Sequence, residues 1–147
     1  MYSKHGKDIH LPSWFIEGLP SIPLDGELSL GRGTFEQMAT LLNSKTSDWS
    51  NVKYYLFDSP IEAIEYELRM EQLRNILLPP HVVFIPMERC KDQHHLEKLL
   101  DGILAAGGEG LMAREPKSIH SFGRSKSILK VKVQISCRRM LIVKEIP

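Results

Sequence analysis

Two lysines and one glutamate in this 147-residue chain have the types and spacing that phosphate chemistry requires. Glu109 stands between two glycines in the run GGEGLMAREP. Glycine on both sides costs backbone entropy, so the run predicts that another part of the molecule passes close to this backbone. Lys130 and Lys132 alternate in the run SILKVKV, which places both ammonium groups on one face of a strand. A carboxylate near such a pair could hold a divalent cation beside phosphate oxygens.

A glycine-rich run and an aromatic run add further parts. In LDGELSLGRGTF, Glu27 precedes a Gly-Arg-Gly turn that contains Arg32, and the strand-like run YYLFD ends in Phe57 and Asp58. An aromatic ring near such a turn gives a nucleobase a face on which to stack. Together these features indicate a site for a nucleotide polyphosphate. Each feature alone has a plainer reading, as an exposed strand face, a turn, a loop carboxylate or a core ring.

Composition bounds the class of protein. Apolar residues make up 42% and charged residues 25% of the chain, which is typical of one globular domain. The net charge is +1, but residues 117–144 carry eight basic side chains and no acid, which indicates polyanion contact or a solvated face. No apolar run approaches the roughly 18 residues of a membrane span. The two cysteines form no C-x-x-C motif, so we expect an intracellular, reducing compartment.

The pattern of apolar residues predicts three helices and six strands, and their irregular order indicates an α+β fold with antiparallel sheets flanked by helices. Thr34 is expected to cap the first helix, which presents Phe35, Met38, Leu41 and Leu42 on one face. Ser59 is expected to cap the second helix, and residues 81–87 are expected to form a central buried strand. The predicted helices cover residues 34–45, 59–78 and 92–107, and the predicted strands cover residues 21–30, 52–58, 81–87, 110–116, 127–133 and 138–146.

In this order the motifs resemble those of ATP-dependent DNA ligases, specifically their nucleotidyltransferase (adenylation) domain. LDGELSLGRGTFEQM is similar to the family's third motif, and YYLFD is similar to the aromatic motif that follows it. EGLMAREP is similar to the fourth motif and ILKVKV to the fifth, whose pattern is L-K-x-K. The resemblance extends over residues 2–133, since the segment that starts at YSKHG resembles the stretch between the first and third motifs. It implies the family's ATP-grasp-like α+β fold.

The resemblance also implies roles for individual residues. Glu27 would hold the ribose hydroxyls of the adenylate, and Phe57 would stack on adenine. Glu109 would serve the catalytic metal, Mg²⁺ or Mn²⁺. Lys130 and Lys132 would contact the phosphates of ATP and stabilise the charge that develops during transfer.

The implied partner is nicked duplex DNA, sealed in repair, replication or recombination by a monomeric enzyme. Lys4, Arg32 and Arg124 would contact this DNA, with Arg124 near the nick phosphate or the adenylate. Lys4 stands where the family usually has arginine, so the positive charge is kept but the bidentate geometry is lost.

The family's nucleophile, the lysine of a K-x-D-G motif, is not found in these 147 residues. We expect it to lie upstream, with the oligonucleotide-binding (OB-fold) barrel downstream, so that this chain is an N-terminally incomplete adenylation domain. The chain alone would then be inactive in the lysine adenylation step. Two alternatives stay open: a non-catalytic nucleotide- or nucleic-acid-binding remnant, and a relative of RNA ligases or mRNA-capping enzymes.

Overall fold

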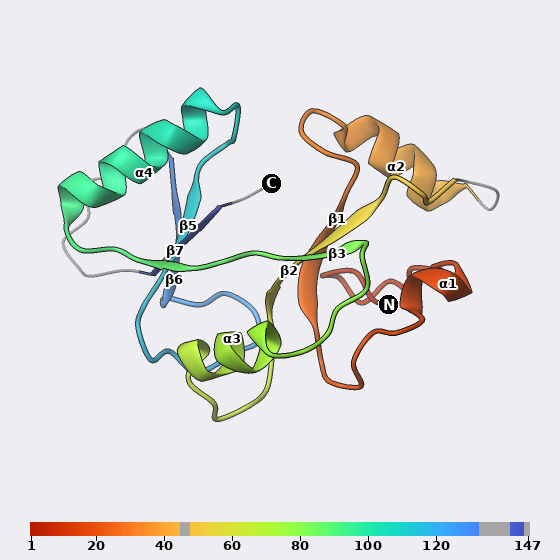
Figure 1. Ribbon diagram of the computed structural model, residues 1–147, viewed down its shortest axis with the longest axis horizontal. Coiled ribbons are helices and arrows are strands. Elements are labelled where there is room, and N and C mark those ends of the chain that lie inside the picture. The colour runs from red at the N-terminus through yellow and green to blue at the C-terminus, as the bar shows by residue number, and fades with distance from the viewer. Residues whose placement is uncertain (45–47, 133–141, 146–147) are drawn as a thin grey trace.

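The protein folds into two lobes, each built on a small sheet (Figure 1). The computed structural model describes residues 1–44, 48–132 and 142–145. Its elements follow in the order α1 (Ser13–Ile16), β1 (Asp25–Ser29), α2 (Phe35–Asn43), β2 (Lys53–Asp58), α3 (Tyr66–Arg74), β3 (Val82–Phe84), β4 (Glu88–Arg89), α4 (Gln93–Ala105), β5 (Leu111–Arg114), β6 (Ile128–Val131) and β7 (Ile142–Glu145). The predicted α+β class is confirmed. In the described part of the chain, no helix is long and apolar enough to cross a membrane.

The first lobe is a three-stranded sheet in the order β1-β2-β3. β1 pairs antiparallel with β2, whereas β2 pairs parallel with β3, because α3 carries the chain between them. The prediction that residues 81–87 form a central strand is wrong, since β3 lies at the edge and β2 is central. An apolar run reports burial of side chains and not the number of hydrogen-bonded neighbours. The core of this lobe is fully buried at Phe15, Val52, Leu56, Met70 and Leu73.

The second lobe is a four-stranded sheet in the order β4-β7-β5-β6, with α4 packed against it (Figure 1). β5 pairs antiparallel with both β6 and β7. Leu96 and Leu100 of α4 share a core with Leu111, Ala113 and Val131 of the strands. The face of residues 127–133 opposite the two lysines is apolar but only partly buried, since Val131 is buried and Leu129 is 44% exposed. Val133 lies outside the described residues.

The predicted first helix forms with one correction at its start. α2 spans Phe35–Asn43 with Thr34 at its N-cap, but the Thr34 hydroxyl donates to the carbonyl of Gly31 and caps no helix N–H. Phe35 is 85% exposed, whereas Met38 and Leu41 are buried. The Phe35 ring, in the first turn of the helix, therefore points away from the core.

The predicted second helix is too long. The Ser59 side chain is buried and donates to the carbonyl of Pro23, and Ala63 has a φ of 59°, which an α-helix does not contain. The helix therefore begins only at Tyr66. Its buried face includes Arg69, whereas Leu68 is 51% exposed.

The third helix agrees with its prediction. The Asp92 carboxylate accepts a hydrogen bond from the His95 N–H at 2.8 Å, and Gly107 ends the helical segment with a φ of 80°.

A buried carboxylate joins the two lobes. Asp58 ends β2 and is fully buried. Its Oδ1 lies 2.8 Å from Nε of Arg69 on α3, and its Oδ2 lies 3.1 Å from Nη2 of Arg114 on β5. The ring of Tyr66 lies 4.3 Å from the Arg114 guanidinium, and burial raises the pKa of its hydroxyl to about 12. One side chain of the first lobe therefore holds α3 and the second lobe together.

Asp58→Asn should lower the free energy of unfolding by about 3–5 kcal/mol, because it leaves two buried guanidinium groups without their anion. Asp8→Asn is the control, since the Asp8 carboxylate is 55% exposed and lies 3.7 Å from the terminal amine, and its loss should cost less than about 1 kcal/mol. Urea denaturation followed by circular dichroism measures both values. Equally small losses of unfolding free energy in the two variants would contradict the stabilising role of Asp58 and its two arginines.

Candidate active site

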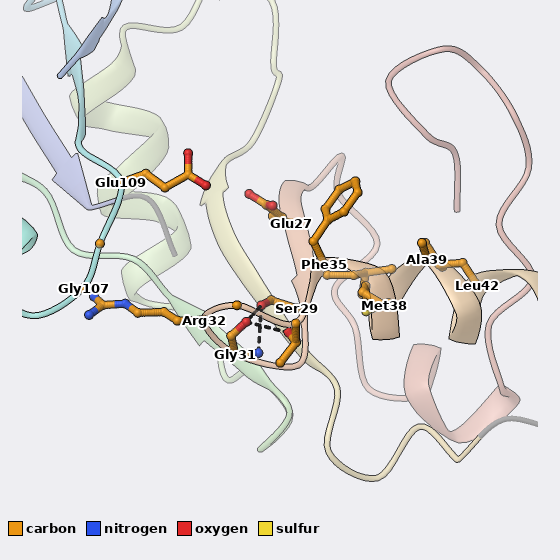
Figure 2. A pocket seen from close by; sticks show the side chains of 14 residues that line it. Glu27, Ser29, Gly31, Arg32, Phe35, Met38, Ala39, Leu42, Gly107 and Glu109 are labelled. Carbon is orange, nitrogen blue, oxygen red and sulfur yellow. Dashed lines mark hydrogen bonds between the residues drawn. The ribbon is translucent and has the colours of Figure 1, made fainter.

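A cleft lies between the two lobes, with a carboxylate on each side (Figure 2). Its volume is about 340 Å³. β1, α2 and the turn between them form one wall, and residues 107–109 form the other. The side chains of Glu27 and Glu109 point toward each other across the cleft, and Arg32 reaches along it toward Gly107 (Figure 2). Residues more than 70 positions apart in the sequence thus face one space.

The predicted phosphate-binding residues come together beside this cleft. Nζ of Lys130 lies 3.4 Å, and Nζ of Lys132 lies 3.9 Å, from Oε2 of Glu109. All three side chains are largely exposed, at 46%, 57% and 66% respectively. Exposed ion pairs contribute little to stability, so a ligand that competes for the lysines has little to overcome.

The two glycines around Glu109 are explained by close contacts. A Cβ on Gly108 would lie 2.4 Å from Cγ2 of Ile103, and one on Gly110 would lie 2.3 Å from the carbonyl oxygen of Val131. Gly110 also has a φ of 152°, which disfavours any side chain. The prediction of a close backbone approach is confirmed, and the approach is made by the end of α4 and by β6.

A second, larger hollow of about 1130 Å³ adjoins the first at β1. Lys4, Glu27, Tyr54 and Phe57 are among the residues that line it, and Glu27 lines both spaces. Gly26 allows β1 to lie close to β2, since a Cβ there would meet the Tyr54 ring at 2.6 Å. Glu27 is exposed and Phe57 is half-buried. The residues that the resemblance assigned to ribose and adenine therefore border one hollow.

Two predicted DNA contacts, Arg32 and Arg124, lie on different elements of the structure. Arg32 lines the cleft. Arg124 is exposed on the loop between β5 and β6 and is not among the residues that line the two hollows. Phe122, which stands two positions before Arg124, does line the larger hollow, so this loop reaches that space although Arg124 itself is not part of its lining.

No functional role was predicted from the sequence for Asp58, Arg69 or Arg114. A signal for Asp58 was present, because its position alternates in phase with Tyr54 and Leu56, both of which are buried. An acid in phase with core residues is rarely buried without a partner. The partner itself could not be read from the pattern.

The donor set fits a magnesium-type ion better than a transition metal. No group of three or more His, Cys, Asp or Glu side chains is placed to hold a metal within the described residues. Mg²⁺ needs no such cage, because it is typically bound by one or two carboxylates together with substrate phosphates and waters. Glu27 and Glu109, which face one cleft, meet that requirement.

The family comparison decides the class of protein. Residues 10–132 match the ATP dependent DNA ligase domain. The chain belongs to this ligase family. A DNA ligase of Haemophilus influenzae (strain Rd) is 31% identical over 136 residues, which are 90% of this chain and 51% of that protein. A solved structure from a study of Lig E DNA ligases and their DNA binding with a minimal scaffold has a TM-score of 0.80 and 29% identity.

The solved Lig E match covers 89% of this chain and 54% of that one, so the ligase domain described here spans about half the length of these relatives. The predicted identity, a DNA ligase adenylation domain of mixed α+β fold, is confirmed. The matched range includes Glu27, Phe57, Glu109 and the lysine pair, while Lys4 lies before it.

Gly110→Ala should lower the free energy of unfolding of this ligase domain by about 2–3 kcal/mol, because the new methyl group meets a backbone carbonyl at a strained φ. Gly102→Ala is the matched control. Gly102 lies within α4 with no atom close to its added Cβ, so alanine should raise stability by about 0.5–1 kcal/mol. Thermal and urea unfolding of both variants measure the difference, and a neutral Gly110→Ala would show that this backbone can move.

Proposed function

We propose that this chain forms the ATP- and phosphate-binding part of an ATP-dependent DNA ligase, which seals nicks in duplex DNA through enzyme-AMP and DNA-AMP intermediates. The observation that carries the proposal is the convergence of Glu109, Lys130 and Lys132 beside a cleft whose other wall presents Glu27. Neither a plain strand face nor a loop carboxylate would need such a juxtaposition. Membership of the ligase family supplies the reaction.

The nucleoside end of ATP occupies the larger hollow in this proposal. The ring of Phe57 stacks on adenine, and the Glu27 carboxylate accepts hydrogen bonds from the ribose hydroxyls, which a charged acceptor strengthens. Because Glu27 borders both spaces, a ribose held there directs its phosphates from the larger hollow into the cleft.

The phosphate end lies against the lysine pair. Lys130 and Lys132 share one carboxylate at 3.4 and 3.9 Å, so the local charge of these three groups is +1. A triphosphate carries several negative charges and competes with a single carboxylate for both ammonium groups. Lys130 on β6 and Lys132 directly after this strand then stabilise negative charge as it develops on the transferred phosphoryl group.

A divalent ion, Mg²⁺ or Mn²⁺, would be held by Glu109. Such an ion offsets charge on the phosphate oxygens during phosphoryl transfer. Glu109 thereby changes partners, because polyphosphate binding takes the lysines from it and leaves its carboxylate for the cation.

The proposed macromolecular partner is nicked duplex DNA. The enzyme is proposed to act as a monomer inside the cell. Lys4, Arg32 and Arg124 are the candidate contacts, and phosphate contacts of this kind fix the register of a protein on DNA without reading its sequence. Arg124 is exposed and is not among the residues that line the two hollows, which favours a contact to the DNA strand over one to the adenylate.

In the complete protein that carries this segment, Lys132→Ala and Glu109→Ala should each slow nick sealing by about 10²–10³-fold, which is typical for the loss of a charge-stabilising group. Sealing of a nicked, labelled duplex under single-turnover conditions measures the rate. Lys98→Ala is the control, since Lys98 is an exposed lysine on α4 and should leave the rate near normal.

Near-normal sealing by either site variant would show that the assigned roles are wrong. ATP binding by the wild-type protein without any sealing would instead favour the non-catalytic binding alternative.

A further inference from the structure

The loop between β5 and β6 carries an exposed aromatic ring beside the hollow assigned to the nucleoside. Phe122 is 78% exposed, and it lines the same hollow as Phe57 and Glu27. The two rings come from different lobes, since Phe57 belongs to β2 and the loop leaves the second sheet. A ligand in this hollow therefore meets aromatic surface from both lobes.

Two independent contacts fix the start of this loop. The backbone N–H of Lys117 donates a bifurcated hydrogen bond to both carboxylate oxygens of Glu67, at 2.9 and 3.1 Å. The carbonyl of Ser118 accepts from the Tyr66 N–H at 3.0 Å and from Nη1 of Arg69 at 3.4 Å. α3 therefore holds the loop four residues before its exposed ring.

The same arginine ties this loop to the base-stacking strand. Arg69 binds Asp58 through Nε and Nη2, at 2.8 and 3.0 Å, and Asp58 directly follows Phe57. Phe122 itself is held edge-to-face by His120, with ring centroids 5.0 Å apart and planes at 83°. These contacts reduce the conformational freedom that Phe122 would lose on binding a ligand.

We propose that Phe122 is a second aromatic contact for the nucleoside of ATP, acting with Phe57 to hold its base or sugar in the larger hollow. This inference rests on the proposed function. Lys4 lines the hollow as well, and its positive charge suits a ligand that carries phosphates. The contact would add affinity for the nucleoside without adding affinity for the polyphosphate.

Isothermal titration of the chain with ATP and, separately, with inorganic tripolyphosphate distinguishes the two ends of the ligand. Phe122→Leu keeps an apolar side chain but removes the ring, and should weaken ATP binding about 5- to 150-fold, the range expected for loss of one stacking contact. Its tripolyphosphate binding should equal that of the wild type. Ile119→Ala is the matched control, because Ile119 is 58% exposed on the same loop and lies outside the residues that line the hollow.

Phe57→Leu separates failure of this inference from failure of the proposed function. If Phe57→Leu weakens ATP binding but Phe122→Leu matches the wild type, the inference is overturned and the nucleotide site stands. If the wild-type chain binds ATP no better than tripolyphosphate, both are overturned. A loss for Phe122→Leu with both phosphate binding and the circular dichroism melting curve unchanged supports the inference.

Discussion

The geometry of this protein depends on one buried carboxylate. Asp58 binds Arg69 of α3 and Arg114 of β5, at 2.8 and 3.1 Å, in a place where water is excluded. Its backbone neighbour Phe57 borders the nucleoside hollow, and Arg114 closes the strand that Glu109 precedes. The spacing between the proposed base-stacking and phosphate-binding groups is therefore set where the two arginines meet Asp58. Buried pairs break only at high cost, which keeps this relation fixed.

The groups proposed to bind the ligand are exposed to solvent, in contrast to the buried Asp58 cluster. Glu109 and its two lysines are exposed and, among the residues that the structure describes, bind only to one another, so their contacts exchange readily. The backbone beneath Glu109 is nevertheless confined, because Gly108 and Gly110 lie against Ile103 and Val131. Side chains that exchange partners readily, on a backbone with little room to move, would suit the proposed phosphate-binding site. A tightly packed backbone and readily exchanged side-chain contacts thus occur at adjacent residues.

Several features that depend on neighbouring residues in the chain were predicted correctly from the sequence. Alternation placed Lys130 and Lys132 together, paired glycines predicted a close approach at Glu109, and an aspartate cap predicted the start of α4. Tertiary contacts decided the rest. The second helix is shorter than predicted, because the Ser59 hydroxyl donates to the carbonyl of Pro23 and does not cap a helix. β3 is an edge strand, which its apolar run could not reveal because strand order depends on how α3 connects β2 to β3. The resemblance to ligases named the roles, which spacing alone could not.

The most direct test is a crystal structure of the chain with a non-hydrolysable ATP analogue and Mg²⁺. The account predicts phosphate oxygens at hydrogen-bond distance from both Lys130 and Lys132, and the base in the hollow beside Phe57. Glu109 should have left the lysines and turned to the ion. A nucleotide bound elsewhere, with both lysine contacts to Glu109 unchanged, would contradict it.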